Sequence, residues 1–310
     1  MTRPAQPPTV FLVNPASANG STRRAWPEIA HRAAVAGLEG ETLFSDGPGG
    51  ISRIAERAVG MGAKRVVVVG GDGTVNEAAN GLLSVGAGNE VELAVIPRGT
   101  GTDFVRTFGI PTKVDEALVV ARDGAVRAID AGKVSYRAWD GAEGSAFFVN
   151  VASAGMSGAV AMRANSTSKA LGGQVSFLWA TLAVFARWRN VEVSVDVGDE
   201  HREGSMLDVI VANCEWLGGG MHLTPNAKPD DGLFDVLLIG DVTKRDLVQT
   251  LPKIYRGTHL PHPKAEELRG ATVLVDAATP LPVELDGEQP GTTPATFEVV
   301  PGALRLRVPT

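Results

Sequence analysis

The chain has very little cysteine and no long apolar run, and each absence narrows what the protein can be. Its 310 residues include a single cysteine, Cys214, which excludes an intrachain disulfide and makes a reducing cytoplasm the expected compartment. No stretch reaches the roughly 18 apolar residues of a membrane-spanning helix. The segment Met1–Val13 is broken by prolines and lacks the apolar region of a secretory signal. We therefore expect a cytoplasmic protein without a transmembrane segment.

A long basic stripe is also missing, and the net charge is −6. Both observations argue against nucleic acid as the partner. Hydrophobic residues make up 44% of the chain, which is enough for a substantial core. The length suggests one large domain or two ordinary ones, and the sequence contains no internal repeat or low-complexity segment.

Two kinds of secondary-structure pattern follow each other along the chain. Residues 1–130 alternate strand and helix patterns, with strands expected at Thr9–Val13, Glu41–Phe44, Lys64–Val69 and Val91–Ile96. After Asp130 the pattern changes to short strands separated by turns. We therefore predict an N-terminal Rossmann-like parallel α/β domain, residues 1–130, and a mostly antiparallel C-terminal domain, residues 131–310, that resembles a β-sandwich. The last residues are expected to pack back on the first domain, with the active site in the cleft between the domains.

The most informative segment is a run of four valines, residues 66–69, followed by Gly-Gly-Asp-Gly-Thr at 70–74. The valines predict a strand buried on both faces, and the glycines allow backbone N–H groups to approach a phosphate. The segment is neither a Walker A loop, because no Gly-Lys-Ser/Thr follows, nor a dinucleotide fingerprint. The alternative is a tight turn from strand to helix in which Asp72 caps the helix.

A second glycine loop, residues 97–103, follows the next predicted strand. Here the glycines free the backbone, the threonines offer hydroxyl groups, and Asp103 lies in the first turn of the next helix. By itself this pattern also fits a helix start whose acid complements the dipole. Because both loops leave the carboxyl ends of neighbouring parallel strands, we expect them to share a ligand.

Two acidic turns follow in the second half of the chain. Residues 225–235 contain Asp-Asp-Gly before a strand, and closely spaced oxygen ligands of this kind suit Mg²⁺. The alternative is a solvated acidic turn. Asp286-Gly287-Glu288 follows the predicted strand Pro282–Leu285, and Asp-Gly is also an ordinary hairpin turn.

Together these residues resemble the soluble bacterial diacylglycerol kinase family, whose catalytic domain is shared with sphingosine and ceramide kinases. The matching motifs run nearly end to end: Asn14-Pro15, residues 70–74 with Asn76-Glu77, residues 97–103, Asn150 with Gly155, residues 218–221, residues 225–235 and residues 286–288. The first glycine motif is shared with NAD kinases and phosphofructokinases. The combination with Asp-Asp-Gly-Leu and Asp-Gly-Glu is far more specific to lipid kinases.

The resemblance implies a role for each matching residue. The first loop, with Gly70, Gly71, Gly73 and Thr74, would bind the ATP phosphates. Asn14 and the second loop, at Gly99 and Thr100, would lie close to the nucleotide. Asp72 would help to hold the catalytic Mg²⁺–ATP, with Asp103 in the same acidic network. Asp231 would belong to a second, structural Mg²⁺ site together with the carbonyl groups of Lys228 and Leu233. Glu288 would be the general base that takes the proton from a lipid hydroxyl.

The chain departs from the family at Thr102, where relatives usually have asparagine. A hydroxyl is shorter and has one donor, so nucleotide preference is the property most exposed to this change. Two other functions stay open: an NAD kinase, and a non-catalytic nucleotide-binding protein of the same fold. The acceptor lipid and the oligomeric state, monomer or homodimer, are not given by the sequence.

A lipid acceptor at a membrane surface requires an apolar route into the protein. Helices are expected at Phe177–Arg189 and Lys244–Tyr255. The first is apolar on both faces, which favours a buried helix. Its terminal arginine and tryptophan residues instead suit docking at the inner face of a membrane. Core packing is the favoured interpretation, with membrane docking as the alternative.

Overall fold

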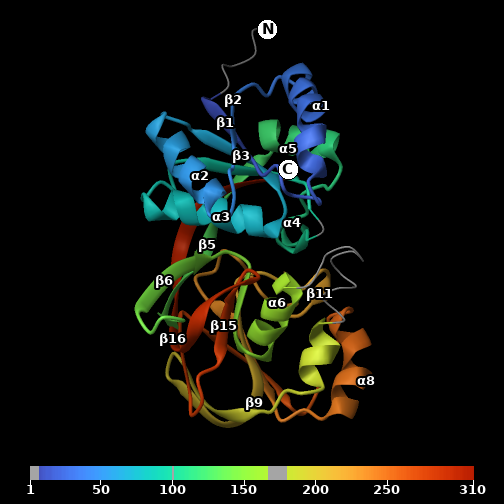
Figure 1. Ribbon diagram of the computed structural model, residues 1–310, viewed down its shortest axis with the longest axis vertical. Helices are drawn as coiled ribbons and strands as arrows, with labels where there is room; N and C mark the ends of the chain where they lie inside the picture. Colours follow the sequence, from blue (N-terminus) through green and yellow to red (C-terminus); the bar gives the residue numbers. More distant parts are fainter. Residues whose placement is uncertain (1–6, 100, 167–179) are drawn as a thin grey trace. The chain divides into compact units, whose positions relative to one another are not determined.

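The computed structural model describes residues 7–99, 101–166 and 180–310 (Figure 1). The chain forms two compact units. Unit 1 runs to Ile129 and also contains Gly302–Thr310, and unit 2 comprises Asp130–Pro301. The chain passes from one unit to the other within β5 (Ala125–Ala138) and within β16 (Glu288–Val308). Unit 2 is therefore an insertion in unit 1.

Unit 1 contains a parallel sheet whose strand order is β2-β1-β3-β4-β16. Its strands are β1 (Thr9–Val13), β2 (Glu41–Phe44), β3 (Arg65–Gly70), β4 (Glu92–Pro97) and the end of β16, where Arg305 and Leu306 pair with Glu92 and Leu93. All six residues of β3 are buried, as expected for a central strand covered on both faces. The last residues of the chain thus complete this sheet.

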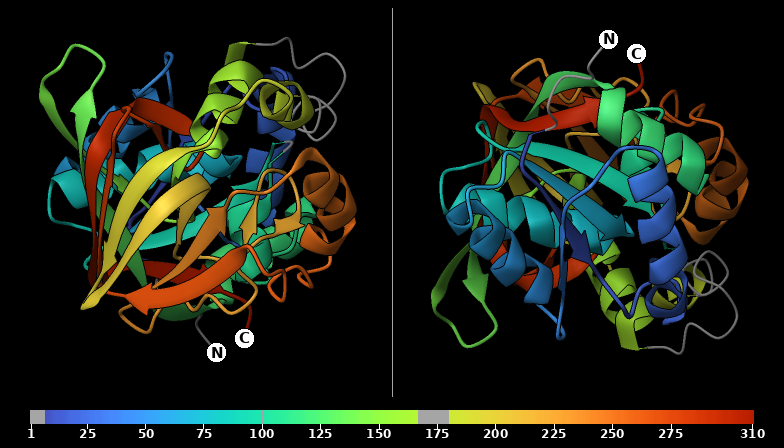
Figure 2. Two further views of the ribbon diagram at one scale, coloured as in Figure 1. Left: turned by 90° about the horizontal axis from the view of Figure 1, so that it is seen from below. Right: turned by 90° about the horizontal axis from the view of Figure 1, so that it is seen from above.

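Helices cover both faces of the unit 1 sheet (Figure 2, right). They are α1 (Ser21–Val35), α2 (Gly50–Gly60), α3 (Asp72–Ser84), α4 (Asp103–Thr107) and α5 (Val114–Asp123). Phe11, Val13, Val67 and Val69 pack in one core with Trp26 and Ile29 of α1 and with Leu118 of α5. Because side chains alternate along a strand, the residues between them face α2 and α3.

Unit 2 is built from antiparallel strands. They are β6 (Glu143–Phe148), β7 (Val151–Gly155), β8 (Val191–Val197), β9 (Glu200–Ala212), β10 (Trp216–Leu217), β11 (Met221–His222), β12 (Phe234–Gly240), β13 (Ala265–Gly270), β14 (Thr272–Ala277) and β15 (Pro282–Leu285). One strand order is β13-β12-β9-β7-β15-β16, while β14 joins β16 to β8 and β8 joins β9.

Two long strands of unit 2 change partners along their length, and the left view of Figure 2 shows how the strands curve. The first half of β9 pairs with β8 and its second half with β7. The first part of β16 pairs with β15, and residues 295–298 pair with β14. Such shared strands turn one sheet into another around a common core. Phe148, Phe234 and Phe297 lie at the centre of this core. The ring centroid of Phe234 lies 5.5 Å from that of Phe148, and the ring centroid of Phe297 lies 6.4 Å from it.

Helices α6 (Met156–Ser166) and α8 (Lys244–Ile254) pack with residues 180–185, which are also helical. Residues 177–179 of the expected helix Phe177–Arg189 lie outside the described residues. In the described part, Ala180 and Phe185 are buried against side chains of α6, β9 and α8. None of the helices among the described residues is long and apolar enough to cross a membrane.

Candidate active site

The two glycine loops of unit 1 are in direct contact. Gly70, at the end of β3, pairs in register with Pro97 at the end of β4, and the N–H of Arg98 donates to the Gly70 carbonyl at 2.7 Å. A Cβ added to Gly99 would lie 2.7 Å from the Gly71 Cα atom, so a larger residue does not fit. The loops therefore form one surface at the carboxyl ends of the strands, where open α/β sheets bind ligands.

Asp72 connects these loops through its carboxylate. The atom Oδ2 accepts a hydrogen bond from the N–H of Asp103 at 3.1 Å, and Oδ1 accepts one from Phe104 at 3.2 Å. The sequence alternative had Asp72 capping its own helix. Instead α3 begins at Asp72 itself without a side-chain cap, and the carboxylate caps α4, where Thr102 makes no side-chain cap bond. Each carboxylate oxygen has further lone pairs for a cation.

Asn14 and Thr74 come from different loops and meet at this surface. Asn14 follows β1, and its Nδ2 donates to the Thr74 hydroxyl at 3.0 Å. The Asn14 carbonyl of the side chain accepts from the N–H of Ala16 at 3.0 Å, which fixes the orientation of the amide. The β1–α1 loop is thereby joined to the first turn of α3, which also contains Gly73. Thr100 lies outside the described residues.

The first turn of α3 provides a place for an anion. This helix has 13 residues and starts directly after a buried parallel strand. The first amide groups of a helix have no partner within it, and the helix dipole adds partial positive charge there. Glu77 has a different role, because it accepts from the N–H groups of Gly49 at 3.2 Å and Ile51 at 3.0 Å and thus holds the start of α2.

Arg98 is a site residue that the sequence reasoning missed. Its guanidinium is half-buried and donates from Nη2 to the Ser21 hydroxyl at the start of α1, 3.3 Å away. A cation at the edge where open α/β sheets bind ligands can neutralise charge on a bound anion. The available clue was that Arg98 is the only cationic residue in the loop 97–103.

In unit 2, the turn that contains Asp231 is held by ion pairs and backbone hydrogen bonds. The carboxylate of Asp231 pairs with Arg269 and accepts from the N–H of Leu233 at 3.2 Å. Arg269 also lies 3.4 Å from Asp235. Asp130 accepts from the N–H of Gly232 at 2.8 Å, and its own N–H donates to Pro229 at 2.7 Å. Sequence reasoning treated Asp130 only as a domain boundary.

The carboxylate and carbonyl oxygens at this turn are the type of ligand that a hard cation prefers. The described residues hold no cluster of three or more His, Cys, Asp or Glu side chains arranged around a metal. Mg²⁺, however, usually takes only one or two carboxylates and completes its shell with waters. Burial raises the pKa of Asp235; Arg269 opposes this, and Asp231 and Glu267 add to it. Three carboxylates thus interact here while the guanidinium of Arg269 pairs with only two of them, Asp231 and Asp235, an environment that favours added positive charge.

The Asp286-Gly287 segment is a two-residue hairpin turn between β15 and β16. Leu285 pairs with Glu288, and Asp286 and Gly287 both have positive φ, 49° and 96°. The hairpin alternative is therefore realised. The Asp286 carboxylate also accepts N–H bonds from Val149, Asn150 and Val151 at 2.8, 3.0 and 3.0 Å. This contact holds the turn against the start of β7.

Glu288 is exposed at the first position of β16. The structure does not place it on a strand next to the Asp231 turn, because that turn precedes β12, and β9 and β7 separate β12 from β15 in the strand order. The two acidic motifs of unit 2 therefore form separate sites.

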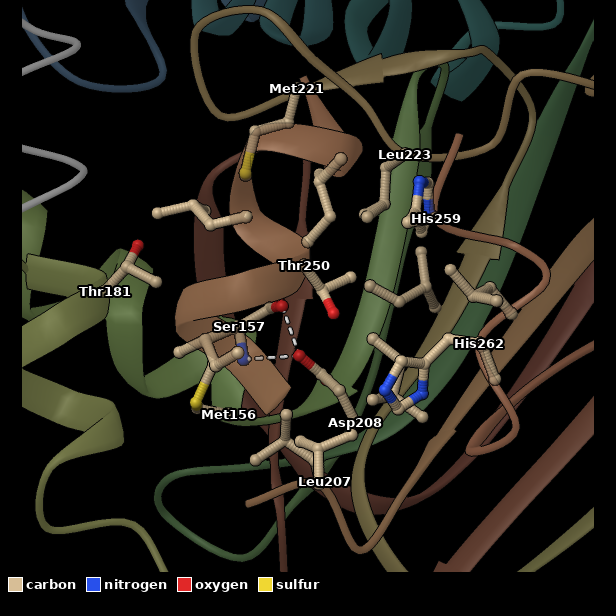
Figure 3. A pocket seen from close by; sticks show the side chains of 18 of the residues that line it. Met156, Ser157, Thr181, Leu207, Asp208, Met221, Leu223, Thr250, His259 and His262 are labelled. Atoms are coloured by element: carbon tan, nitrogen blue, oxygen red, sulfur yellow. Dashed lines mark hydrogen bonds between the residues drawn. The ribbon is translucent and has the colours of Figure 1, made fainter. Parts of the chain in front are cut away.

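Unit 2 also contains an apolar cavity of about 100 Å³ with polar groups at its wall (Figure 3). Its aliphatic lining includes Leu207, Ile210, Met221, Leu223, Leu237 and Leu251. Asp208 also lines it, fully buried, and accepts hydrogen bonds from the N–H of Ser157 at 2.8 Å and from the Ser157 hydroxyl. Burial raises the pKa of Asp208 to about 7 and lowers the pKa of His259. The sequence did not indicate this cavity.

Both halves of the chain match known protein families. Residues 8–134 match the family described as the diacylglycerol kinase catalytic domain, and residues 150–308 match the YegS C-terminal NAD kinase beta sandwich-like domain. A diacylglycerol kinase of Staphylococcus saprophyticus is 26% identical over 287 residues, covering 93% of this chain and 90% of that protein. A Pseudomonas aeruginosa protein named "Probable lipid kinase YegS-like" is 34% identical, covering 84% of this chain and 82% of that protein.

Two solved structures share the fold. A diacylglycerol kinase from Bacillus anthracis has a TM-score of 0.74 at 22% identity, with 99% of this chain and 98% of that chain covered. The yeast NADH kinase complexed with NADH has a TM-score of 0.54 at 12% identity, with 95% and 78% covered. At these identities the likeness concerns the fold alone.

The two adjoining matches define a two-domain lipid kinase, α/β in its first half and β-sandwich-like in its second, which confirms the predicted fold class of both domains. The chain belongs to the bacterial diacylglycerol kinase and YegS-like lipid kinase family, as the resemblance in the sequence indicated.

Proposed function

We propose that this protein transfers the γ-phosphoryl group of ATP, supplied as its Mg²⁺ complex, to a hydroxyl group of diacylglycerol or a related membrane lipid. In this reaction the lipid oxygen attacks the γ-phosphorus and the bond between that phosphorus and the bridging oxygen breaks. The hydroxyl proton passes to Glu288, and the electron pair of the broken bond leaves with ADP. Phosphoryl transfer of this kind needs mainly positioning and charge neutralisation.

The nucleotide half of the proposal rests on the surface of the two glycine loops. The first turn of α3 and the guanidinium of Arg98 supply positive charge. Gly71 and Gly99, which lie in contact, have no side chains that would keep a ligand away from the backbone. Asp72, which accepts two N–H bonds from the start of α4, would bind the cation that accompanies ATP. Its hydrogen bonds fix its orientation before the nucleotide binds, so little reorganisation is needed.

A structural Mg²⁺ is proposed at the Asp231 turn. Asp231 and the carbonyl oxygens of Lys228 and Leu233 would hold it, and the cation would add positive charge beside the interacting carboxylates of Asp231 and Asp235. Arg269 also contributes positive charge to this turn through its ion pair with Asp231. The hydrogen bond from the N–H of Gly232 to Asp130 would keep this turn in the conformation that binds the cation.

The apolar cavity of unit 2 is the observation that carries the choice of a lipid as acceptor. A nicotinamide dinucleotide is polar throughout, whereas this cavity is walled mainly by aliphatic side chains (Figure 3). Pockets with apolar walls and a few polar groups are typical of small-molecule sites, and the polar groups orient the ligand. Asp208 and Ser157 are such groups here, and an acyl chain would fill the rest.

The outer face of α8 supports the proposal that the protein acts at a membrane surface. Its inner face lines the cavity with Leu247, Leu251 and Ile254, while Val248 is 64% exposed on the outside. Lys244, Arg245 and Lys253 of α8 and Arg256 just after it are also exposed, and none of these cationic residues forms an ion pair with another described residue. Lys244 and Arg245 occupy the first turn, where the helix dipole disfavours cations, so helix stability does not explain them. A basic amphipathic helix of this kind suits anionic lipid headgroups.

The test offers γ-labelled ATP and Mg²⁺ to the purified protein with a total lipid extract, and in a parallel reaction with NAD. We expect a labelled lipid whose identity gives the acceptor. Glu288→Gln should lower kcat by about 10²-fold to 10⁴-fold with nucleotide affinity unchanged. Glu298→Gln, an exposed glutamate on the same strand, is the matched control and should stay active.

Each other result has a definite meaning. Labelled NADP without labelled lipid would make the protein an NAD kinase. Bound ATP without any labelled product would favour a non-catalytic nucleotide-binding protein. Near wild-type turnover of Glu288→Gln would remove Glu288 from the mechanism.

A further inference from the structure

Asn150 lies where the Asp286-Gly287 turn meets the wall of the apolar cavity. It directly precedes β7 and is only 4% exposed. Its backbone N–H donates to Asp286 Oδ1 at 3.0 Å, and its side-chain Nδ2 donates to the Trp216 carbonyl of β10 at 2.9 Å. One residue is therefore bonded both to the turn that precedes Glu288 and to β10.

The hairpin of β10 and β11 forms one side of the cavity. Leu217 and Met221 of the hairpin line it, and so does Leu223 just after β11 (Figure 3). Leu217 and Leu223 also pack in one cluster with Val151. Asn150 therefore bonds to the backbone of the same hairpin whose side chains a bound lipid would contact.

Contacts within the hairpin fix its shape. The ring of Trp216 stacks on that of His222, with centroids 4.0 Å apart, and His222 Nε2 lies 2.7 Å from a carboxylate oxygen of Glu215. The N–H of Leu223 donates to the Glu215 carbonyl at 3.0 Å and closes the hairpin. A hydrogen bond to the Trp216 carbonyl therefore places the hairpin as a whole.

We propose that Asn150 is a positioning residue for lipid transfer: its amide holds β10 in a fixed place relative to the Asp286-Gly287 turn, so that a lipid seated in the cavity presents its hydroxyl group to Glu288. The inference rests on the proposed function, in which the cavity binds the lipid and Glu288 is the base.

The turn itself does not depend on the side chain of Asn150. Asp286 accepts its three N–H bonds from the backbone of the segment that contains Asn150, and any residue at this position supplies that donor. The N–H of Gly287 donates to the buried carboxyl group of Glu284, which also accepts from the Ser153 hydroxyl of β7 at 3.1 Å. Truncating Asn150 thus leaves the turn held and breaks its link to β10.

The bond to β10 requires an amide. A carboxylate at this position has nearly the same shape but no N–H, and it would set an oxygen against the Trp216 carbonyl. The Oδ1 atom of Asn150 is buried and forms no hydrogen bond with another described residue, so the amide contributes through Nδ2 alone. Asn150→Asp therefore tests the bond, and Asn150→Ala tests the side chain.

The first experiment separates lipid transfer from the chemistry of the nucleotide. Both variants should lower kcat for the lipid by about 10²-fold, the usual effect of a small misplacement of reacting groups. The KM for the lipid should change by less than about threefold, because the side chains that line the cavity are kept. The KM for ATP, and the slow hydrolysis of ATP by water without lipid, should equal those of wild type.

A core variant controls for a loss of stability. Val195 of β8 is fully buried in the main core of unit 2, and Val195→Ala removes two methyl groups there. Urea unfolding measures the stability of each variant, and circular dichroism checks that each is folded. We expect Val195→Ala to be less stable than wild type but to keep its kcat. Wild-type kcat in either Asn150 variant, or a loss of kcat in Val195→Ala that matches its loss of stability as in Asn150→Ala, would overturn the proposal.

Failure of the proposed function would be seen separately, in a binding experiment without catalysis. Oleate, a long-chain fatty acid, is added to wild type and to Asn150→Ala, and the backbone amide signal of Gly287 is followed by NMR. We expect the chemical shift of Gly287 to change in wild type and to stay constant in Asn150→Ala, because the variant lacks the bond between β10 and the turn. This result without any phosphorylated lipid would refute the proposed reaction and keep the link through Asn150. An equal change in both proteins, or none in wild type, would overturn the role of Asn150.

Discussion

The N–H of Asp103 donates to the Oδ2 atom of Asp72 at 3.1 Å, so the first residue of α3 holds the first residue of α4. The two acids that the sequence assigned to one network are joined through a backbone group. Asp72 therefore serves the fold of the loop pair and, in the proposed function, also the cation that accompanies ATP. A substitution there has to separate the two roles.

Asp72→Asn affects the two roles to different extents. Asparagine keeps one side-chain oxygen for α4, but its NH2 group faces the second N–H donor, and the charge that attracts a cation is lost. We expect phosphate transfer to fall by at least about 10²-fold, as for loss of one preorganised electrostatic group. Thermal unfolding should occur at a modestly lower temperature than in wild type, because one N–H group at the start of α4 loses its acceptor. Full activity of the variant with labelled ATP would exclude the metal role, and Asp115→Asn on α5 is the surface control.

Arg98→Ala should act on nucleotide binding. Removing the guanidinium, which lies beside Ser21 at the start of α1, would take away the charge-assisted hydrogen bond proposed for the ATP phosphates, so KM for ATP should rise by about tenfold. Arg98→Lys keeps the charge but loses the planar fork, and should lie between the two. Arg57→Ala on the exposed side of α2 is the comparison, and an unchanged KM in Arg98→Ala would place Arg98 outside the nucleotide site.

Asp286→Ala should destabilise unit 2. Three backbone N–H groups lose their acceptor at once, and each unsatisfied group costs about 1–3 kcal/mol. We expect the free energy of unfolding in urea to drop by at least about 2 kcal/mol. Asp276→Ala, an exposed aspartate on β14, should change it by less than about 0.5 kcal/mol. Similar midpoints for both variants would show that water replaces the carboxylate.

Stability should depend on pH through Asp208 and Glu284. Burial raises both pKa values, to about 7 and about 8, above those of the unfolded chain. The folded state therefore binds more protons between about pH 5 and pH 8, and the free energy of unfolding should fall as pH rises through this window. The full contribution is present below the unfolded pKa values. Urea titrations at several pH values measure it, and Asp208→Asn with Glu284→Gln should flatten the slope.

The outer face of α8 gives a prediction about membranes. Vesicles that contain anionic phospholipid should carry the protein into the pellet. The double reversal Lys244→Glu with Arg245→Glu should weaken binding by about tenfold or more, since each surface cation contributes about 1 kcal/mol. Arg23→Glu with Arg24→Glu is the matched pair at the start of α1. Equal loss in both pairs would indicate general charge attraction rather than docking by α8.

Local patterns predicted the strands well where one feature dominated. Thr9–Val13, Glu41–Phe44 and Pro282–Leu285 were expected as strands and have these bounds in the structure, because β-branched and alternating residues mark them. The 21 residues of β16 were not expected to form one long strand, since its prolines and glycines interrupt the pattern. α3 begins at Asp72, within the first glycine loop, because packing against the second loop outweighs the low helix propensity of glycine.

The sequence indicated which residues form the candidate site, but it did not indicate which residues they contact. Sequence spacing placed both glycine loops at one edge, and the pairing of Gly70 with Pro97 agrees. The contacts of Asp286 with Val149–Val151 and of Glu284 with Ser153 join residues more than 130 positions apart. No local pattern contains such pairs. Buried groups such as Asp208 become recognisable only when the fold shows what surrounds them.

The place of Leu306 beside Leu93 has a consequence for the order of folding. The sheet of unit 1 includes the end of β16, which is synthesised only after the whole of unit 2, and Leu304 and Leu306 are fully buried in it. Arg307 joins the same strand to β4 through its 2.9 Å ion pair with Glu92. Domains usually fold in the order of their synthesis. In this chain, however, the half that is made first acquires this strand of its sheet only after unit 2 has been synthesised, so the sheet that positions the two glycine loops is completed after the inserted unit.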